Sequence, residues 1–399
     1  MKVLLVNDYA TPTGGAELLT LSLRDELRRR GHDARLFASR ARPGAGVAAA
    51  DYECFGTTSR FRTLLQTANP SALQKLRRVL AEFQPDVVHV TMFLTQLSPL
   101  ILPLLKDVPS LYSVVWYRPI CPLGTKMLPN GAECHKPAGA VCYHDGCLPL
   151  RDWLPLMLQM KLWRRWRDAF NLIVANSEAT KRRLVAEGIE PVEVVLNGVP
   201  LQPARPPLSS PPTVAFSGRL VQEKGVGVLV QAFAKVVAEV PEARLIIAGE
   251  GPERERLNKL ITDLGLPAFV SLLGHLPRPE LERRFATAWV QAVPSSWAEP
   301  FGMVAAEAMM RGTAVVASDS GGLTEIIRDG ETGFLVPPGD VNALAGALLL
   351  LLRDCQTAER MGAAGRAVAL ACFSDVTYAD KFVKLYQTLC QNRMNADCS

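Results

Sequence analysis

Short runs of β-branched and aliphatic residues alternate with helix-periodic stretches along most of the chain. Such alternation is typical of βαβ units, which build parallel sheets covered by helices. In the second half each expected strand is followed by a helical pattern, and the strands lie at residues 214–217, 244–248, 270–273, 290–293, 314–317 and 333–336. The pattern predicts an α/β fold with a doubly wound, Rossmann-like sheet in this half.

The first half shows the same alternation with interruptions. A strand at 3–6 is followed by the pair Gly14-Gly15 and by a helical stretch that stops at Gly31. Further strands are expected at 34–38, 86–90, 110–115 and 172–175. Because 399 residues exceed what one hydrophobic core usually supports, we expect two Rossmann-like domains.

A proline-rich segment separates the two halves. Residues 199–212 contain six prolines, which exclude continuous helix or sheet and favour a stiff, extended connector. We therefore expect a first domain at 1–198, a linker at 199–212 and a second domain at 213–375. The closing segment, 376–399, has helical spacing and is expected to join the first domain.

Charge and hydropathy limit the class of partner. Residues 1–200 hold 25 Lys and Arg against 18 Asp and Glu, an excess that suits a phosphorylated substrate or an anionic membrane surface and is too dilute for nucleic acid. The first apolar run ends at Asn7, so we expect a strand there and no signal peptide. The apolar run 343–352 is shorter than the roughly 20 residues of a membrane span. We expect a cytoplasmic protein that is soluble or peripheral on the membrane.

Two cations follow the first strand of the second domain. Arg219 and Lys224 lie on a loop that begins at Gly218 and enters a helix after Gly225. Ligands of open α/β sheets bind beyond the carboxyl ends of the strands, where Arg, Lys and a helix N-terminus all favour phosphate. A diphosphate is the expected partner, although cations at a helix start are often only solvated.

Two carboxylates follow the strand at 290–293. Glu299 lies on the loop, and Glu307 projects from an otherwise apolar helix whose start Gly302 opens to a ligand. The other residues of this helix start are Phe301, Met303 and Val304. A buried carboxylate needs a polar partner, and ribose or sugar hydroxyls would satisfy both. The alternative is a surface loop with one solvated glutamate.

Glycine-rich turns follow two more strands. In Gly249-Glu250-Gly251 the glycines would leave room for a flat base, whereas Gly321-Gly322 also fits simple turn chemistry.

Taken together and in this order, these motifs resemble the large retaining glycosyltransferase family of the GT-B fold known as family 4. The resemblance covers almost the whole chain, and its most specific part is the pair Glu299 and Glu307 within Glu-Pro-Phe-Gly. It implies two facing Rossmann-like domains with a cleft between them: an acceptor-side first domain and a donor-binding second domain. It also implies a nucleoside diphosphate sugar donor, a glycan or lipid-linked acceptor and no obligatory divalent metal.

The resemblance also implies roles for single residues. Arg219 and Lys224 would hold the diphosphate, Glu299 would contact donor sugar hydroxyls in catalysis, and Glu307 would bind the ribose. Gly14-Gly15 with Glu17 looks like the family's glycine loop near the donor phosphate and acceptor.

The chain departs from the family at one position. Many relatives have a His-Asp pair six residues before a Cys-Pro, whereas Val115 and Trp116 occupy those places here. We expect both, with Tyr117, on the acceptor side. The missing histidine leaves open reduced activity, a different donor or a substitute group. His89 is one candidate substitute, and a structural role is the alternative that we favour.

A cysteine-rich insert spans 121–149. It contains Cys121, Cys134, Cys142 and Cys147, which are enough ligands for a tetrahedral zinc site. Their separations of twelve, seven and four intervening residues match no standard zinc module, so an ordered loop with free thiols is favoured.

The stretch 151–167 mixes tryptophans with cations. It would either lie in a membrane interface near a lipid-linked acceptor or pack against the core.

The function we predict is transfer of a hexose-type sugar from a UDP- or GDP-linked donor, with retention, in polysaccharide or glycolipid assembly. The rivals are a catalytically silent binding protein and a nucleotide-sugar hydrolase or epimerase.

Overall fold

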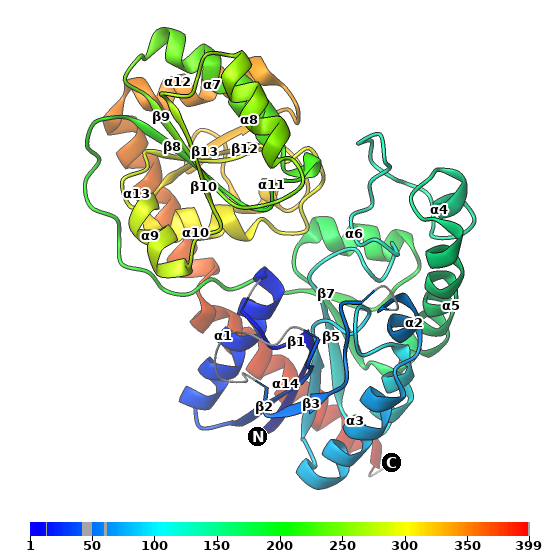
Figure 1. Ribbon diagram of the computed structural model, residues 1–399. Helices are drawn as coiled ribbons and strands as arrows, with labels where there is room; N and C mark the ends of the chain where they lie inside the picture. The colour runs from blue at the N-terminus through cyan, green and yellow to red at the C-terminus, as the bar shows by residue number, and fades with distance from the viewer. Residues whose placement is uncertain (13, 42–49, 60–61, 398–399) are drawn as a thin grey trace. The chain divides into compact units, whose positions relative to one another are not determined.

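The computed structural model describes residues 1–12, 14–41, 50–59 and 62–397. It divides into two compact units, the first made of 1–198 with 375–399 and the second of 199–374 (Figure 1). Each unit is a parallel sheet covered by helices. The predicted α/β class with two Rossmann-like sheets is therefore confirmed.

The described residues of the first unit form seven parallel strands in the order β3-β2-β1-β4-β5-β6-β7. Their bounds are β1 Lys2–Tyr9, β2 Asp33–Ser39, β3 Tyr52–Cys54, β4 Val87–Val90, β5 Ser110–Val114, β6 Leu172–Ala175 and β7 Val192–Val194. All five expected strands are present. The sequence missed β3 and β7, which are edge strands of three residues and too short to show a period of two.

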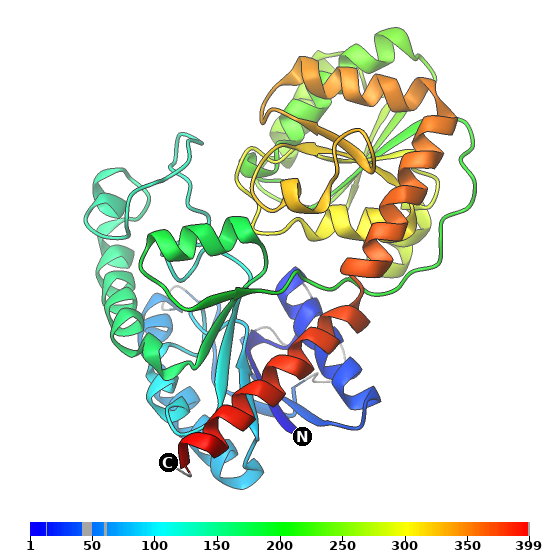
Figure 2. The same ribbon diagram turned by 180° about the vertical axis from the view of Figure 1, so that it is seen from behind.

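Seven α-helices flank this sheet in the described residues. They are α1 Gly15–Arg29, α2 Arg62–Thr67, α3 Pro70–Phe83, α4 Val141–His144, α5 Leu150–Trp166, α6 Glu178–Ala186 and α14 Asp375–Asp397, with the 3₁₀ turns η1 Pro99–Leu105 and η2 Arg167–Ala169. The C-terminal helix α14 lies beside α1 and across β4 (Figure 2). Its buried Tyr378, Phe382 and Tyr386 complete the core over Leu5 and Leu23.

The second unit has six parallel strands in the order β10-β9-β8-β11-β12-β13. They are β8 Thr213–Ser217, β9 Arg244–Ala248, β10 Val270–Gly274, β11 Val290–Val293, β12 Ala314–Ser318 and β13 Gly333–Val336, so all six predicted strands are confirmed. The covering helices are α7 Val226–Glu239, α8 Arg254–Asp263, α9 Arg278–Phe285, α10 Met303–Arg311, α11 Leu323–Ile326, α12 Val341–Arg353 and α13 Cys355–Cys372, with η3 Gln222–Lys224 before α7.

This strand order creates a topological switch point between β8 and β11. From β8 the chain builds the sheet in one direction, and from β11 it builds the other, so the loops after these strands diverge at the carboxyl edge. The two loops touch through their backbones, because a Cβ on Gly225 would lie 1.8 Å from the carbonyl oxygen of Pro294. Gly225 also has a φ of +68°, which glycine adopts most readily. The two loops that carry predicted site residues are thus in direct backbone contact at the switch point.

The proline-rich segment is bound along the second unit. The Arg205 amide donates to the carbonyl of Arg311 (2.9 Å), and its guanidinium contacts Glu359 of α13 (2.8 Å) and the carbonyl of Gly312 (3.0 Å). Arg366 of α13 donates to the carbonyl of Gln202 at 2.8 Å. The expected extended connector is therefore fastened to α13, with the Arg205 side chain only 3% exposed.

Replacing Arg205 by Met should release this segment. The change removes hydrogen bonds to a carboxylate and a carbonyl, which stabilise by about 1 to 3 kcal/mol. We expect chymotrypsin to cleave the Arg205→Met variant faster after Leu201 or Leu208, as measured by mass spectrometry. Arg256→Met, which breaks an exposed pair with Glu253 in the same unit, is the control. Equal cleavage rates in both variants would show that Arg205 does not hold the segment.

Candidate functional site

An ion pair joins the two loops at the switch point of the second unit. Lys224 Nζ lies 2.5 Å from Glu299 Oε1, and Ser295 Oγ donates to the same oxygen at 2.7 Å. The Lys224 ammonium also lies 5.4 Å from the centre of the Trp297 ring. The structure therefore brings together two predicted site residues that are 75 positions apart in the sequence.

The Glu299 side chain is only 8% exposed. Burial alone would raise the pKa of this carboxyl, but the charge and hydrogen bond of Lys224 and the hydrogen bonds of Ser295 and Trp297 hold the pKa below its ordinary value. Glu299 therefore stays ionised at neutral pH and can accept hydrogen bonds only.

Arg219 is the outward cation of the same loop. Its side chain is 68% exposed, and its contact with Glu223 is long, at 3.6 Å. Exposed pairs of this kind contribute little stability. Arg219 is thus free to turn toward an anion, whereas Lys224 already has a fixed place.

Glu307 lies on α10 with a side chain that is 15% exposed. Its Oε1 accepts a hydrogen bond from Arg278 Nη1 of α9 at 2.9 Å. The sequence predicted that this glutamate needs a polar partner, but it did not identify Arg278. No motif or spacing relates residue 278 to residue 307, so only the packing of α9 against α10 shows the pair.

Gly302 begins α10 with a φ of +105°. Met303 and Val304 form its half-buried first turn, where the helix dipole favours an anion. The Phe301 ring, in contrast, is 2% exposed and packs against Phe373 at 5.9 Å between ring centres. The ring therefore supports the loop through this packing, and the expected contact of Phe301 with a donor stays a prediction.

The turn after β9 packs against the turn after β8. A Cβ on Gly249 would lie 1.8 Å from the carbonyl oxygen of Gly218, and one on Gly251 would lie 2.3 Å from that of Leu220. Glycine at these two positions therefore allows the backbones of the two turns to approach closely. From the sequence we had expected the glycines to leave room for a nucleotide base. Glu250 between them has a 53% exposed side chain, paired with Arg254 at 2.8 Å.

In the first unit, the predicted glycine loop begins α1. The Glu17 side chain turns back over it, so that a Cβ on Gly14 would lie 2.4 Å from the Glu17 carboxylate. Glu17 is only 5% exposed. Gly14 precedes α1 and Gly15 begins it, after β1 as expected, while the Glu17 carboxylate faces Gly14.

The segment that replaces the expected His-Asp pair follows β5. Val115 is half-buried against Tyr9 and Met92, and Trp116 is half-buried over Gly124. Tyr117 is fully buried, with the Arg183 guanidinium 4.8 Å from its ring centre. No solvent reaches the Tyr117 side chain in this conformation, and its expected place on the acceptor side stays a prediction.

His89 is a structural residue. It is 0% exposed and lies between the Tyr386 hydroxyl of α14 (2.6 Å) and the Ser113 hydroxyl of β5 (2.8 Å). Burial lowers the pKa of its imidazole to about 3. His89 therefore fastens α14 to the sheet and does not replace the missing histidine.

Asp8, at the end of β1, was not singled out from the sequence. It is 0% exposed and accepts hydrogen bonds from the Thr95 amide (2.8 Å) and hydroxyl (2.6 Å) and from the amides of Gln96 (2.7 Å) and Leu97 (2.9 Å). Burial raises its pKa, although these hydrogen bonds act against the rise. Asp8 fixes the loop after β4 at the switch point of the first sheet. The signal was a polar pair, Asn7-Asp8, at the end of an apolar strand.

The described residues of the cysteine-rich insert are not grouped as metal ligands. Among the described residues, no three His, Cys, Asp or Glu side chains are grouped to hold a metal, and Cys121, Cys134, Cys142 and Cys147 are free thiols. Burial raises the pKa of Cys142 and Cys147, which keeps both protonated. The insert therefore has four free thiols in this structure, as favoured from the sequence, and the zinc alternative stays untested.

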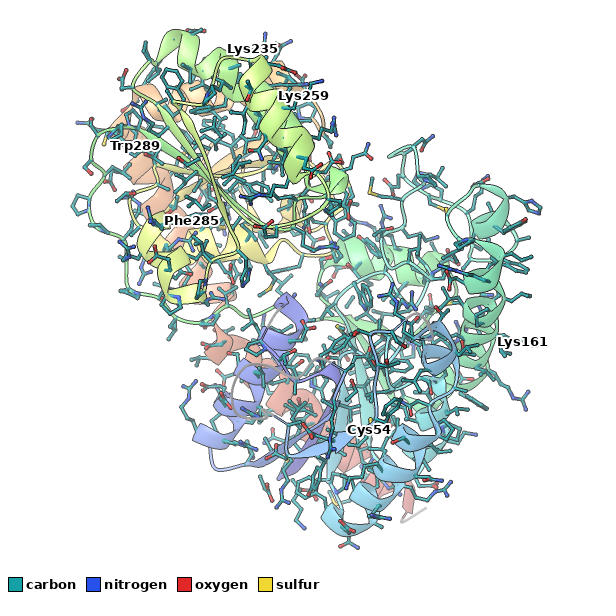
Figure 3. The ribbon with its side chains drawn as sticks, viewed as in Figure 1. Cys54, Lys161, Lys235, Lys259, Phe285 and Trp289 are labelled. Atoms are coloured by element: carbon teal, nitrogen blue, oxygen red, sulfur yellow. The ribbon has the colours of Figure 1, made fainter. Side chains whose placement is uncertain are left out.

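Helix α5 has two different faces. Trp163 is buried among Phe93, Tyr112 and Phe170, so one face belongs to the core. The opposite face exposes Leu150, Leu154 and Leu158 at 52%, 58% and 51% and continues into Lys161, which points outward (Figure 3). Across the described ranges, no helix has the length and hydropathy needed to cross a membrane.

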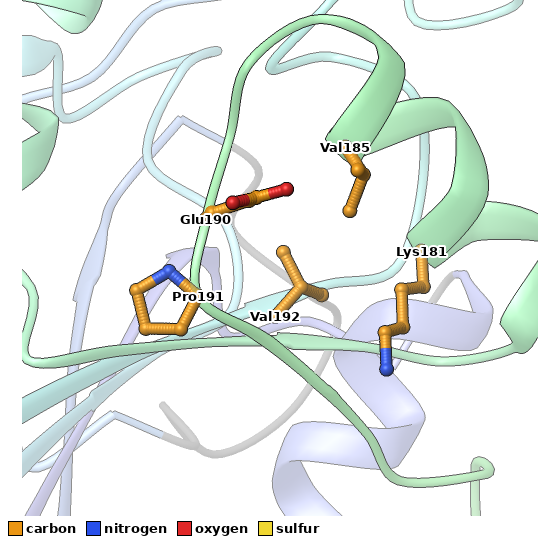
Figure 4. Close-up of a pocket in the computed structure, with 5 residues that line it drawn as sticks. All are labelled: Lys181, Val185, Glu190, Pro191 and Val192. Atoms are coloured by element: carbon orange, nitrogen blue, oxygen red, sulfur yellow. The ribbon is translucent and has the colours of Figure 1, made fainter.

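A shallow pocket lies elsewhere in the first unit, between α6 and the start of β7. It is lined by Lys181, Val185, Glu190, Pro191 and Val192, and the two valines point toward one another (Figure 4). It lies at the amino end of β7, opposite the edge where sheets of this class bind ligands, and it contains no predicted site residue.

Family models match both halves of the chain. Residues 13–203 match the model described as Glycosyltransferase Family 4, and residues 202–368 match the one described as Glycosyl transferases group 1. The phosphatidyl-myo-inositol mannosyltransferase of Mycobacterium leprae is 34% identical over 244 residues, which cover 59% of this chain and 64% of that protein. The matched segment spans less than two thirds of the length of such curated relatives.

Solved structures share the fold. Sucrose-phosphate synthase from Thermosynechococcus elongatus aligns with a TM-score of 0.74 and 23% identity over 98% of this chain and 99% of that one. Anabaena HepE in complex with UDP-glucose aligns with a TM-score of 0.71 and 22% identity over 97% and 100%. At these identities the likeness shows a two-domain, Rossmann-like GT-B fold.

The buried imidazole predicts a pH dependence of stability. His89 has a folded-state pKa of about 3, below the ordinary 6.5, so the unfolded chain binds the extra proton first. The stabilisation by neutral His89 is complete above pH 6.5 and declines as the pH falls toward 3. Relative to His89→Gln, the wild-type free energy of unfolding should fall by about 3 kcal/mol between pH 6.5 and 4. Parallel urea-unfolding profiles of the two proteins would contradict the burial of a neutral histidine.

Proposed function

We propose that this chain, which belongs to the family 4 glycosyltransferases of the GT-B fold, transfers a hexose-type sugar from a nucleoside diphosphate, UDP or GDP, to an acceptor hydroxyl with retention of configuration. The observation that carries the proposal is the buried pair of Lys224 and Glu299 beside the exposed Arg219, at the switch point of the second sheet. Switch points are where doubly wound sheets bind nucleotides.

Each charged group has one task in this proposal. Arg219 grips phosphate oxygens through its planar fork, and Lys224 adds a point charge through hydrogens that Glu299 does not use. Together they stabilise the leaving diphosphate while the glycosidic bond breaks toward an oxocarbenium-like state. Glu299 accepts hydrogen bonds from donor sugar hydroxyls, and Glu307 accepts them from the ribose. Because two side-chain cations supply the charge, the proposal includes no divalent metal.

Part of the acceptor side remains apolar in this proposal. The Val115 side chain cannot donate a hydrogen bond to the sugar, and the buried His89 does not provide one, because both of its ring nitrogens are within hydrogen-bond distance of protein hydroxyls. The sugar therefore depends on Glu299 for orientation more than in relatives with a histidine. One similar protein is named for mannosyl transfer to phosphatidyl-myo-inositol, and another, HepE, was solved in complex with UDP-glucose. Both support polysaccharide or glycolipid assembly as the setting of this proposal.

We also propose peripheral contact with the inner face of the membrane through α5. Leu150, Leu154 and Leu158 recur every four residues and so share one exposed face, which Lys161 and Arg165 extend. Leucines enter the acyl boundary and cations attract anionic headgroups. A lipid-linked acceptor would then be presented at the first unit.

Two rival functions share the scaffold. A catalytically silent binding protein is motivated by Val115, and it would bind nucleotide sugar without consuming it. A nucleotide-sugar hydrolase or epimerase would turn over the donor without an acceptor. Mass spectrometry of the donor, with and without an oligosaccharide or lipid acceptor, separates the three, because a transferase needs both substrates for sustained turnover.

Donor binding predicts a ligand-dependent rise in Tm. In a thermal-shift screen of UDP, GDP, ADP and their common sugars, one nucleotide series should stabilise the protein, by about 3 kcal/mol at a hundredfold excess over Kd. Lys224→Met should lose this shift, and Lys235→Met, at an exposed site on α7 (Figure 3), should keep it. No shift with any nucleotide, or an equal shift in Lys224→Met, would contradict the proposal.

Membrane contact predicts lipid-dependent sedimentation. The wild type should co-sediment with vesicles containing phosphatidylglycerol and much less with pure phosphatidylcholine vesicles. Replacing Leu154 and Leu158 by Gln should reduce the bound fraction several-fold, since about 0.8 kcal/mol is lost per buried methylene. The matched control replaces Leu350 and Leu370 of the second unit by Gln and should leave the bound fraction unchanged. These two leucines are 59% and 41% exposed. Binding independent of anionic lipid would rule out the proposed surface.

A further inference from the structure

Four charged side chains of alternating sign connect α9 to α10 in the second unit. Arg278 and Glu282 lie four residues apart on α9, and Glu307 and Arg311 lie four residues apart on α10. Arg278 contacts Glu307 at 2.9 Å, and Glu282 contacts Arg311 at 3.0 Å. Arg278 and Glu282 are 3.7 Å apart along α9, which links the two contacts into one row.

The row is anchored at its inner end. The Arg311 side chain is 6% exposed. Its Nη2 lies 3.3 Å from the side-chain oxygen of the buried Gln291, and its guanidinium lies 5.7 Å from the ring centre of Phe285. Exposure then rises along the row to 18% for Glu282 and 28% for Arg278. The core thus fixes Arg311, which orients Glu282, which in turn orients Arg278.

The outer end of the row is the carboxylate that the proposed function assigns to the ribose. Arg278 donates to Oε1 of Glu307. In the described part of the chain, Glu307 Oε2 has no hydrogen-bond partner. A carboxylate accepts at both oxygens, so a hydroxyl can bind Oε2 without displacing Arg278. Holding the side chain in advance removes the entropy cost of ordering it when the ligand arrives.

We propose that Arg278 is a positioning residue for nucleotide recognition: it holds Glu307 through Oε1 so that Oε2 accepts a ribose hydroxyl. The inference rests on the proposed function for its ligand. Arg278 acts only through Glu307, so its effect is confined to nucleotides that have the ribose hydroxyls. Glu282 and Arg311 support it from the core.

The test is calorimetric titration of the full-length protein with UDP and GDP, each beside its 2′,3′-dideoxy form. The wild type should prefer the ribonucleotide, and Glu307→Gln should remove most of that preference. Arg278→Met should weaken ribonucleotide binding about tenfold, as expected for a hydrogen bond involving charge, and leave dideoxynucleotide binding unchanged. Arg278→Lys should recover part of the affinity. Arg256→Met, which breaks an exposed pair on α8, is the matched control and should bind as the wild type.

The outcomes separate this inference from the proposed function. If Glu307→Gln keeps the preference for the ribonucleotide, Glu307 does not bind the ribose. That result overturns both the ribose assignment in the proposed function and the positioning role of Arg278. If Glu307→Gln loses the preference but Arg278→Met keeps it, only the positioning role is overturned. Equal weakening of both nucleotide forms in Arg278→Met would show a general structural role and also overturn it. Should Arg278→Met fail to fold, Arg278→Lys decides: a loss of affinity confined to the ribonucleotide supports the positioning role, and an equal loss for both forms, or no loss for either, overturns it.

Discussion

The candidate site depends on the buried contact between Lys224 and Glu299. A carboxylate that is 8% exposed is costly to ionise without a cation, and Lys224 at 2.5 Å provides that cation. The pair joins the loop after β8 to the loop after β11, where Gly225 already touches the backbone of Pro294. Sheet topology brings the loops to one edge, and the charge pair fixes their side chains. The contact between Lys224 and Glu299 therefore both keeps the buried carboxylate ionised and fixes the geometry of the site.

The same arrangement recurs at the second carboxylate. Glu299 is held by Lys224, and Glu307 is held by Arg278, so each glutamate of the motif has a cationic side chain at one carboxylate oxygen. Arg219 lies mostly in solvent, and its contact with Glu223 is long, at 3.6 Å. In the proposed function, the two glutamates accept hydrogen bonds from hydroxyl groups, and the exposed Arg219 turns to the phosphates. The preorganisation of the two glutamates is what electrostatic catalysis requires.

The sequence predicted the architecture well because its signal is periodic and local. All six strands of the second unit were found from apolar runs, whereas β3 and β7 escaped because three residues carry no period. Loop motifs located Lys224 and Glu299 but not Arg278, whose partner is 29 positions away on another helix. The structural role of His89 comes from its hydrogen bond with Tyr386, almost 300 residues further along the chain. No local sequence pattern reveals a contact over that distance. Phe301 and Tyr117 were expected at a ligand, but tertiary packing buries both rings.

The central claim is that the carboxyl edge of the second sheet binds a nucleotide sugar through these groups. The most direct measurement is a crystal structure with UDP-glucose or GDP-mannose, chosen by affinity. The account predicts the diphosphate within hydrogen-bond distance of Arg219 and Lys224, sugar hydroxyls on Glu299, and the ribose on Glu307 with Arg278 still in place. A nucleotide bound elsewhere, or one at this edge whose phosphates contact neither cation, would contradict it.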